Sequence, residues 1–257
     1  MRVTHFISAL GVLCLTCVLC AGSATAATTA AIKVKFAPNV AGAASTVTIT
    51  ANFRASDGGV PAPIRKSVTH LPPGMEIDVS GLRTCSLAKI ELEEPGAGAC
   101  PSTSLLGAGT TFAEVQLGGG GEPIREHAPV TAVLGSAGPG RILIYLDGEG
   151  TYPVTEQVVA RATITGSPAT GQTFTITVPP IPSTVGGPSA SVVDFTISLG
   201  RQKALSLERH RHAHGPLPRG IVLPRSCPRG GLAFPTKLFF QGQKTITTTP
   251  TIPCPRK

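Results

Sequence analysis

Regular alternation of apolar and polar residues is the clearest pattern along this chain. In residues 46–53, apolar side chains occupy every second position, and threonine or asparagine stands between them. The same alternation occurs in residues 173–178, 193–199 and 234–241. Because successive side chains of a strand point to opposite faces, each segment predicts a half-buried β-strand with its polar face outward.

Six further segments have strand-like composition, namely residues 32–36, 64–71, 110–117, 129–134, 141–146 and 154–165. With residues 244–249 they bring the prediction to about eleven strands. The single helix candidate covers residues 86–93, where Ser86 can cap the first turn and Pro95 ends the helix. Many short strands and one short helix predict an all-β fold, a Greek-key or jelly-roll-like β-sandwich.

The first 26 residues follow the pattern of a secretory signal peptide. Arg2 gives a positive start, an apolar stretch of about 16 residues follows, and residues 23–26 end in a small-x-small sequence. An uncleaved anchor is the alternative, but the stretch is shorter than the roughly 20 residues that span a bilayer. We therefore expect cleavage after Ala26 and a secreted or cell-envelope protein with no transmembrane segment left. Residues 27–257 then form one large β domain or two packed β domains.

Seven cysteines reduce to four in the expected mature chain, because three lie within the signal. An even number in an exported chain implies two disulfides, for which three pairings are possible. Short sequence separation favours Cys85–Cys100 and Cys227–Cys254. The second pair brackets two strand-like runs almost symmetrically, so its bond would clamp the base of a hairpin. A four-cysteine zinc site is the alternative, but the close C-x2-C pairs that such sites usually need are absent.

Positive charge is concentrated in the last quarter of the chain. Residues 27–200 have 10 Lys or Arg and 13 Asp or Glu, whereas residues 201–257 have 11 Lys or Arg and one Glu. On an exported protein, this segment favours anionic cell-wall polymers or lipid headgroups as partners. The candidate contacts are Arg209, Arg211, Arg219, Arg225 and Arg229. The alternative is that these charges only keep a β-rich protein soluble.

Three histidines alternate with arginine in the same quarter of the chain. Because alternate residues of an extended segment share a face, His210, His212 and His214 could bind one Zn²⁺ or Cu²⁺ and make the protein a metal-capturing one. The alternative is a solvated basic loop, since the arginines would oppose a bound cation. Asp147 and Glu149 could offer oxygens to Ca²⁺, but two carboxylates are few, and we predict a hairpin turn there.

Motifs for catalysis are absent from the sequence. It contains neither Gly-x-Ser-x-Gly nor His-Glu-x-x-His. A catalytic triad could still assemble from distant residues, so a secreted hydrolase is the main alternative to a binding role. Nucleic-acid binding is not expected, because the protein is exported and its phenylalanines fit a hairpin core better than a stacking surface. We predict no cofactor, and no oligomeric state follows from the pattern.

Two stretches carry a resemblance to known proteins. Leu-Pro-Pro-Gly at residues 71–74 is followed by Cys85 and by residues 100–109, which begin Cys-Pro-Ser and end Gly-Ala-Gly. Cys-Pro-Arg-Gly-Gly at residues 227–231 leads to a closing Pro-Cys at residues 253–254. Together they resemble a group of exported proteins from high-GC actinobacteria with the pattern LPxG, C, CPxxSxxGxG and CPxG…C. This resemblance implies a secreted β-rich fold and no particular activity, cofactor or catalytic residue.

These observations lead to one functional prediction. We expect a secreted, cell-envelope-associated structural or binding protein without catalytic activity. A secreted hydrolase and a metal-capturing protein are the alternatives.

Overall fold

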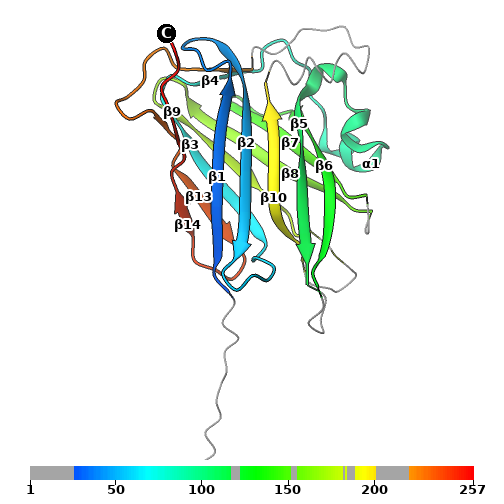
Figure 1. The fold of residues 1–257 in the computed structure, drawn as a ribbon. Coiled ribbons are helices and arrows are strands. Elements are labelled where there is room, and N and C mark those ends of the chain that lie inside the picture. Colours follow the sequence, from blue (N-terminus) through cyan, green and yellow to red (C-terminus); the bar gives the residue numbers. More distant parts are fainter. Residues whose placement is uncertain (1–25, 117–121, 152–154, 182, 184–188, 201–219) are drawn as a thin grey trace, which may run out of the picture.

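The computed structural model describes residues 26–116, 122–151, 155–181, 183, 189–200 and 220–257. These ranges are mostly β-strand, and the predicted all-β sandwich is confirmed (Figure 1). In chain order the strands are β1 (Thr28–Ala37), β2 (Ala44–Ala55), β3 (Ile64–Leu71), β4 (Glu76–Asp78), β5 (Leu105–Val115), β6 (Ile124–Gly135), β7 (Arg141–Glu149), β8 (Gln157–Ser167), β9 (Gly171–Thr177), β10 (Ser191–Leu199), β11 (Gly220–Val222), β12 (Leu232–Ala233), β13 (Thr236–Phe240), β14 (Ile246–Thr248) and β15 (Thr251–Ile252). The helical elements are α1 (Leu87–Leu92) and the 3-10 turns η1 (Gly96–Ala99) and η2 (Ser102–Ser104).

One continuous antiparallel sheet contains most of these strands. Its order is β14-β13-β3-β9-β8-β7-β6-β5-β10-β2-β11-β4, with β1 on β2, while β12 pairs separately with β15. Strands β5 to β9 follow one another as a meander, and β10 then returns to pair with the free edge of β5. A meander closed by a long return connection is the Greek-key arrangement that the sequence pattern predicted.

The sheet folds back on itself into two layers. Strands β1, β2, β10, β5 and β6 form one layer, and β7, β8, β9, β3, β13 and β14 cross behind it at an oblique angle (Figure 1). The layers are continuous through the β6–β7 pair, and on the opposite side β1 lies beside β14. There Thr28 N donates to Gln243 Oε1 at 3.0 Å, and Gln243 Nε2 donates to Ala26 O at 2.6 Å.

Alternation places the core between the layers. On β2 the apolar set Val47, Ile49, Ala51 and Phe53 faces inward, as predicted, and pairs with β1 and β10. Phe53 meets Phe240 of the other layer edge-to-face, with ring centroids 5.4 Å apart. Burial of apolar surface between the layers is the main force that holds them together.

The segment between Cys85 and Cys100 covers the outer face of β6, β7 and β8. Cys85 and Cys100 form the predicted disulfide, and α1 lies within the loop it closes. The predicted cap is also present, because Ser86 Oγ accepts a hydrogen bond from Lys89 N at 3.2 Å. Ile90 of the helix, 1 % exposed, packs on apolar side chains of the sheet and gives the molecule a second, smaller core.

Cys227 and Cys254 form the second predicted disulfide. Between them, β13 and β14 pair as a hairpin, and β12 pairs with β15 nearer the bond. The staple therefore closes the base of the hairpin, as the near-symmetric spacing of the two cysteines predicted.

Candidate functional site

The predicted anionic-polymer surface falls only partly within the described residues. Arg225 and Arg229 are exposed beside the C-terminal disulfide. Arg209, Arg211 and Arg219 lie outside the described ranges. The basic segment stays a sequence-based prediction.

The predicted metal ligands also lie outside the described ranges. His210, His212 and His214 all fall in residues 201–219. Elsewhere, in the residues that the structure does describe, no three His, Cys, Asp or Glu side chains gather in a way that could hold a metal ion. Among the described residues, no helix has both the length and the apolar character that crossing a membrane requires.

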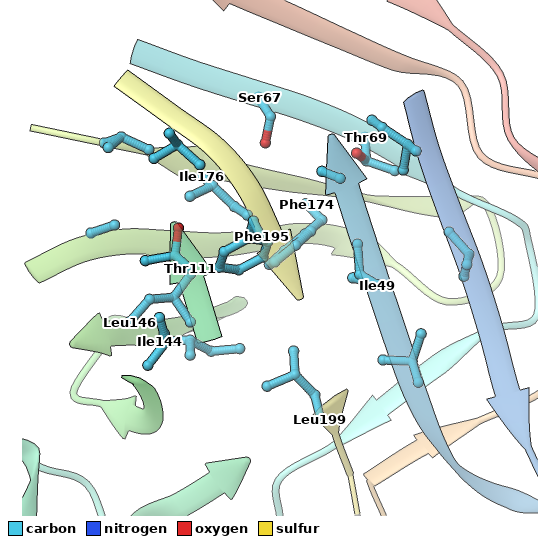
Figure 2. Close-up of a pocket in the computed structure, with 18 of the residues that line it drawn as sticks. Ile49, Ser67, Thr69, Thr111, Ile144, Leu146, Phe174, Ile176, Phe195 and Leu199 are labelled. Atoms are coloured by element: carbon cyan, nitrogen blue, oxygen red, sulfur yellow. The ribbon is translucent and has the colours of Figure 1, made fainter. Parts of the chain in front are cut away.

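A cavity of about 250 Å³ lies between the two layers of the sandwich. Its walls come from both layers, and Figure 2 shows Ile49 and Phe195 from one layer with Phe174 and Ile176 from the other. Most of the lining side chains are aliphatic or aromatic. The interior can thus take an apolar group without displacing a buried polar network.

Small inward residues explain why space is left there. Ala113, Ala128, Ala160 and Gly148 occupy wall positions where larger aliphatic residues would reach across. The chain also has no tryptophan to fill the gap. Protein interiors are normally packed to the density of organic crystals, so a cavity of this size is a departure from ordinary packing.

Hydroxyl groups on the cavity wall are largely held by the protein itself. The Oγ1 atoms of Thr69 and Thr236 lie 3.0 Å apart, and Thr236 Oγ1 donates to Phe234 O at 3.0 Å. Thr111 Oγ1 donates to Asp194 O at 3.0 Å. Ser67, Thr69 and Thr111 stand at the cavity in Figure 2. These groups add little polarity, because their hydrogen bonds run along the wall.

Two carboxylates, Glu126 and Glu156, line the same cavity. Glu126 Oε1 is buried and has no hydrogen-bond partner among the described residues. Burial and, second, the negative charge of Glu156 raise the pKa of Glu126 above its ordinary value. An acidic end on an otherwise apolar cavity is the most unusual chemistry in the described part of the molecule.

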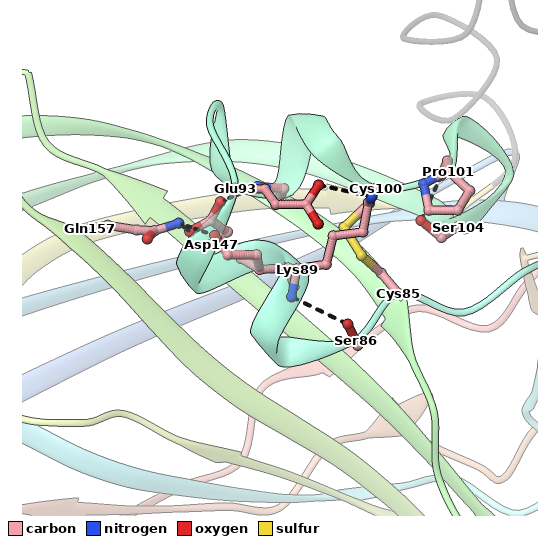
Figure 3. Close-up of a disulfide and its surroundings, with 11 residues drawn as sticks. Cys85, Ser86, Lys89, Glu93, Cys100, Pro101, Ser104, Asp147 and Gln157 are labelled. Carbon is pink, nitrogen blue, oxygen red and sulfur yellow. Dashed lines mark hydrogen bonds and ion pairs between the residues drawn. A yellow bond between two sulfur atoms is a disulfide. The ribbon is translucent and has the colours of Figure 1, made fainter.

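Asp147 does not lie in a hairpin turn, so that prediction is wrong. β7 continues to Glu149, and the Asp147 side chain points out of the sandwich into the disulfide-closed segment (Figure 3). It is 1 % exposed, and its carboxylate accepts from Ala97 N at 2.7 Å and from Gln157 Nε2 at 2.9 Å. Gln157 Nε2 also donates to Ile90 O at 3.0 Å. Through these bonds Asp147 holds the disulfide-closed segment on the sheet, and we assign it this structural role rather than that of a Ca²⁺ ligand.

A charged cluster ties the outer face of the other layer. Asp194 on β10 lies 2.7 Å from both Arg54 on β2 and Arg125 on β6, and Asn52 also donates to it. Burial alone would raise the pKa of Asp194, but the bonds from Arg54 and Asn52 and the charges of both arginines outweigh it and hold the pKa below its usual value. The arginines are about half exposed, so we assign the cluster a structural role.

Sequence reasoning missed the two glutamates, although a signal for them exists. Glu126 shares its strand parity with Val130 and Leu134, and Glu156 shares its parity with Val158. A charge on the apolar face of a strand is the informative exception. The strand predicted from residue 129 leaves out Glu126, because β6 begins five residues earlier, at Ile124, whereas the strand predicted from residue 154 includes Glu156.

No family model, curated protein or solved structure matches this chain.

Proposed function

We propose that this chain is an exported, non-catalytic binding protein of the cell envelope that holds the apolar part of a small molecule inside the sandwich. The cavity between the layers carries the proposal. Export is supported by the signal-like N-terminus and by two disulfides, which persist in oxidising compartments.

The volume indicates the size of the ligand. An apolar cavity of about 150 Å³ holds benzene, so by the same ratio roughly ten carbon atoms fit into a larger one of about 250 Å³. At about 24 cal/mol per Å³, leaving 250 Å³ empty costs on the order of 6 kcal/mol. That figure is comparable with the whole stability of a typical domain, roughly 5–15 kcal/mol. A ligand that fills the space would recover part of it.

Binding of a neutral ten-carbon alcohol tests the proposal. We expect decanol, kept below its solubility limit, to raise the Tm of the protein and to displace a neutral solvatochromic probe. Ala160→Leu fills the cavity from its wall and should abolish both effects. Thr110→Leu adds the same side chain at an exposed position of β5 and should change neither the rise in Tm nor the displacement of the probe. Unaltered decanol binding by a folded Ala160→Leu protein would refute the site.

A salt-sensitive contact with anionic envelope polymers is the proposed means of retention. Exposed Arg225 and Arg229 support it, and further arginines precede them in the sequence. Exposed charges more than ~8 Å apart are largely screened at physiological salt. Co-sedimentation with cell-wall preparations should therefore occur at low salt and fade at high salt. Absence of binding at low salt would assign the charge to solubility.

The glutamate pair favours hydrolysis as a second candidate function. A carboxyl group with a raised pKa beside a second carboxylate is the arrangement that divides acid and base roles in hydrolases. Turnover of generic ester or glycoside substrates, lost on Glu126→Gln, would support catalysis. Absence of turnover by a protein that binds decanol would favour the binding role.

A further inference from the structure

Every charged side chain that lines the described cavity wall is acidic. The three are Asp78, Glu126 and Glu156, with no Lys, Arg or His among the described lining residues. Asp78 Oδ1 is already used, because it accepts from Ser80 N at 3.0 Å and from Ser80 Oγ at 2.5 Å.

Strand register separates Asp78 from the two glutamates. Asp78 on β4 pairs with β11, which lies on the first residues of β2. Glu126 pairs with Ala113 of β5, and Ala113 pairs in turn with Val192 of β10. Val192 lies beyond the residue of β10 that pairs with Asn52, so Glu126 is near the level of the last residues of β2. One end of the cavity therefore has the glutamate pair and the opposite end has a satisfied aspartate.

We infer that the glutamate end receives a cationic head group, so that the ligand is an alkylamine-like amphiphile with a tail of about ten carbons. The inference rests on the proposed function, because it names the ligand class of the same cavity. A positively charged nitrogen with N–H donors would give the buried Glu126 Oε1 the partner that it lacks among the described residues. It would also offset the repulsion between the two carboxylates, and the apolar walls would hold the tail.

The overall charge of the chain makes this preference diagnostic. With a net charge of +8, the protein attracts anionic amphiphiles and repels cationic ones through non-specific electrostatics. A preference for the amine must therefore come from a local acidic site rather than from the average charge.

Calorimetric titration with three ligands of equal tail length tests the inference. Decylamine, decanol and decanoate are compared at pH 7.5 and low salt, below their micellar concentrations. We expect decylamine to bind at least tenfold more tightly than decanol and decanoate to bind more weakly than decanol. Lowering the pH through the raised pKa of Glu126 protonates this carboxylate and should weaken the binding of decylamine only. Glu156 is the described charged group that faces Glu126.

Charge-neutral variants locate the head group. Glu126→Gln and Glu156→Gln should each reduce decylamine affinity at least fivefold, and by a larger factor than either variant changes decanol affinity. Glu91→Gln removes the same charge from exposed α1 and should have no effect. Equal affinity for decanol and decylamine, or insensitivity to both variants, would overturn the cationic head group while the cavity stays a binding site. Failure of all three ligands to bind would instead reject the proposed function.

Discussion

Removing the Asp147 carboxylate should loosen the disulfide-closed segment from the sheet. Asp147→Ala takes away the acceptor of two hydrogen bonds, from Ala97 N and Gln157 Nε2. Ala97 is 2 % exposed, so its N–H group is left unpaired where water has little access. A buried donor without a partner loses its hydration and gains nothing in return.

The size of the effect follows from these two bonds. Hydrogen bonds to a charged group contribute about 1.5–3 kcal/mol each, so the loss of both should lower the free energy of unfolding by roughly 3–6 kcal/mol. In a chain of this size, each kcal/mol lowers Tm by about 2–4 °C. Asp147→Ala should therefore lower Tm by on the order of 10 °C. Asp147→Asn keeps the shape and one acceptor oxygen and should lose roughly half as much.

Urea unfolding followed by circular dichroism measures the loss, and hydrogen exchange locates it. Amide protons of the Cys85–Cys100 segment, Ala97 above all, should exchange faster in both variants. Glu91→Gln, an exposed acid on the same segment, is the control and should change the unfolding free energy by less than about 0.5 kcal/mol. A loss below about 1 kcal/mol in Asp147→Ala would show that the two bonds do not hold the segment.

Three other changes have defined outcomes. Gly109→Ala places a Cβ atom 1.9 Å from a backbone oxygen of β10 and should cost about 2 kcal/mol or more in chemical unfolding, whereas Gly138→Ala meets no atom within 4 Å and should be neutral. Replacing Cys227 and Cys254 together by serine opens a 27-residue loop and should lower the free energy of unfolding by about 3.5 kcal/mol. Calorimetry measures this loss, and equal stability of the serine variant and the original protein would contradict it. Because burial raises the folded-state pKa of Glu126, the contribution of this group to the stability of the ligand-free protein is fully present below the ordinary value of 4.5 and is lost as pH rises through the raised pKa. Glu126→Gln should flatten that fall, and an unchanged pH profile would contradict the assignment.

Local patterns predicted the parts of this fold that depend on local chemistry. β3 has the predicted bounds, because its alternation ends at Pro72 and Pro73 on one side. The α1 cap and the two disulfides follow from residue type and separation. In contrast, β4 and β11 have three residues each, too few to show a period. They depend on distant pairing, because β11 pairs with Ala44 and Ser45 at the start of β2 and β4 pairs with β11.

Features that arise from contacts between distant strands were not predictable from local patterns. Asp147-Gly148 has the composition of a turn, but pairing with both β6 and β8 keeps the strand extended through it. The cavity likewise depends on which small side chains face one another, and Ala113 and Ala160 are 47 residues apart on strands of different layers. No single segment carries that information.

The two faces of β7 connect the staple with the cavity. Ile144, Leu146 and Gly148 line the interior, while Tyr145 and Asp147 point outward under the disulfide-closed segment. A wall that faces a cavity lacks support on that side, because no side chain presses against it from within. The disulfide, Ile90 and the Asp147 bonds supply support from outside. On this argument the segment holds β7 in place, so that an apolar ligand meets a preformed wall and does not have to order it on binding.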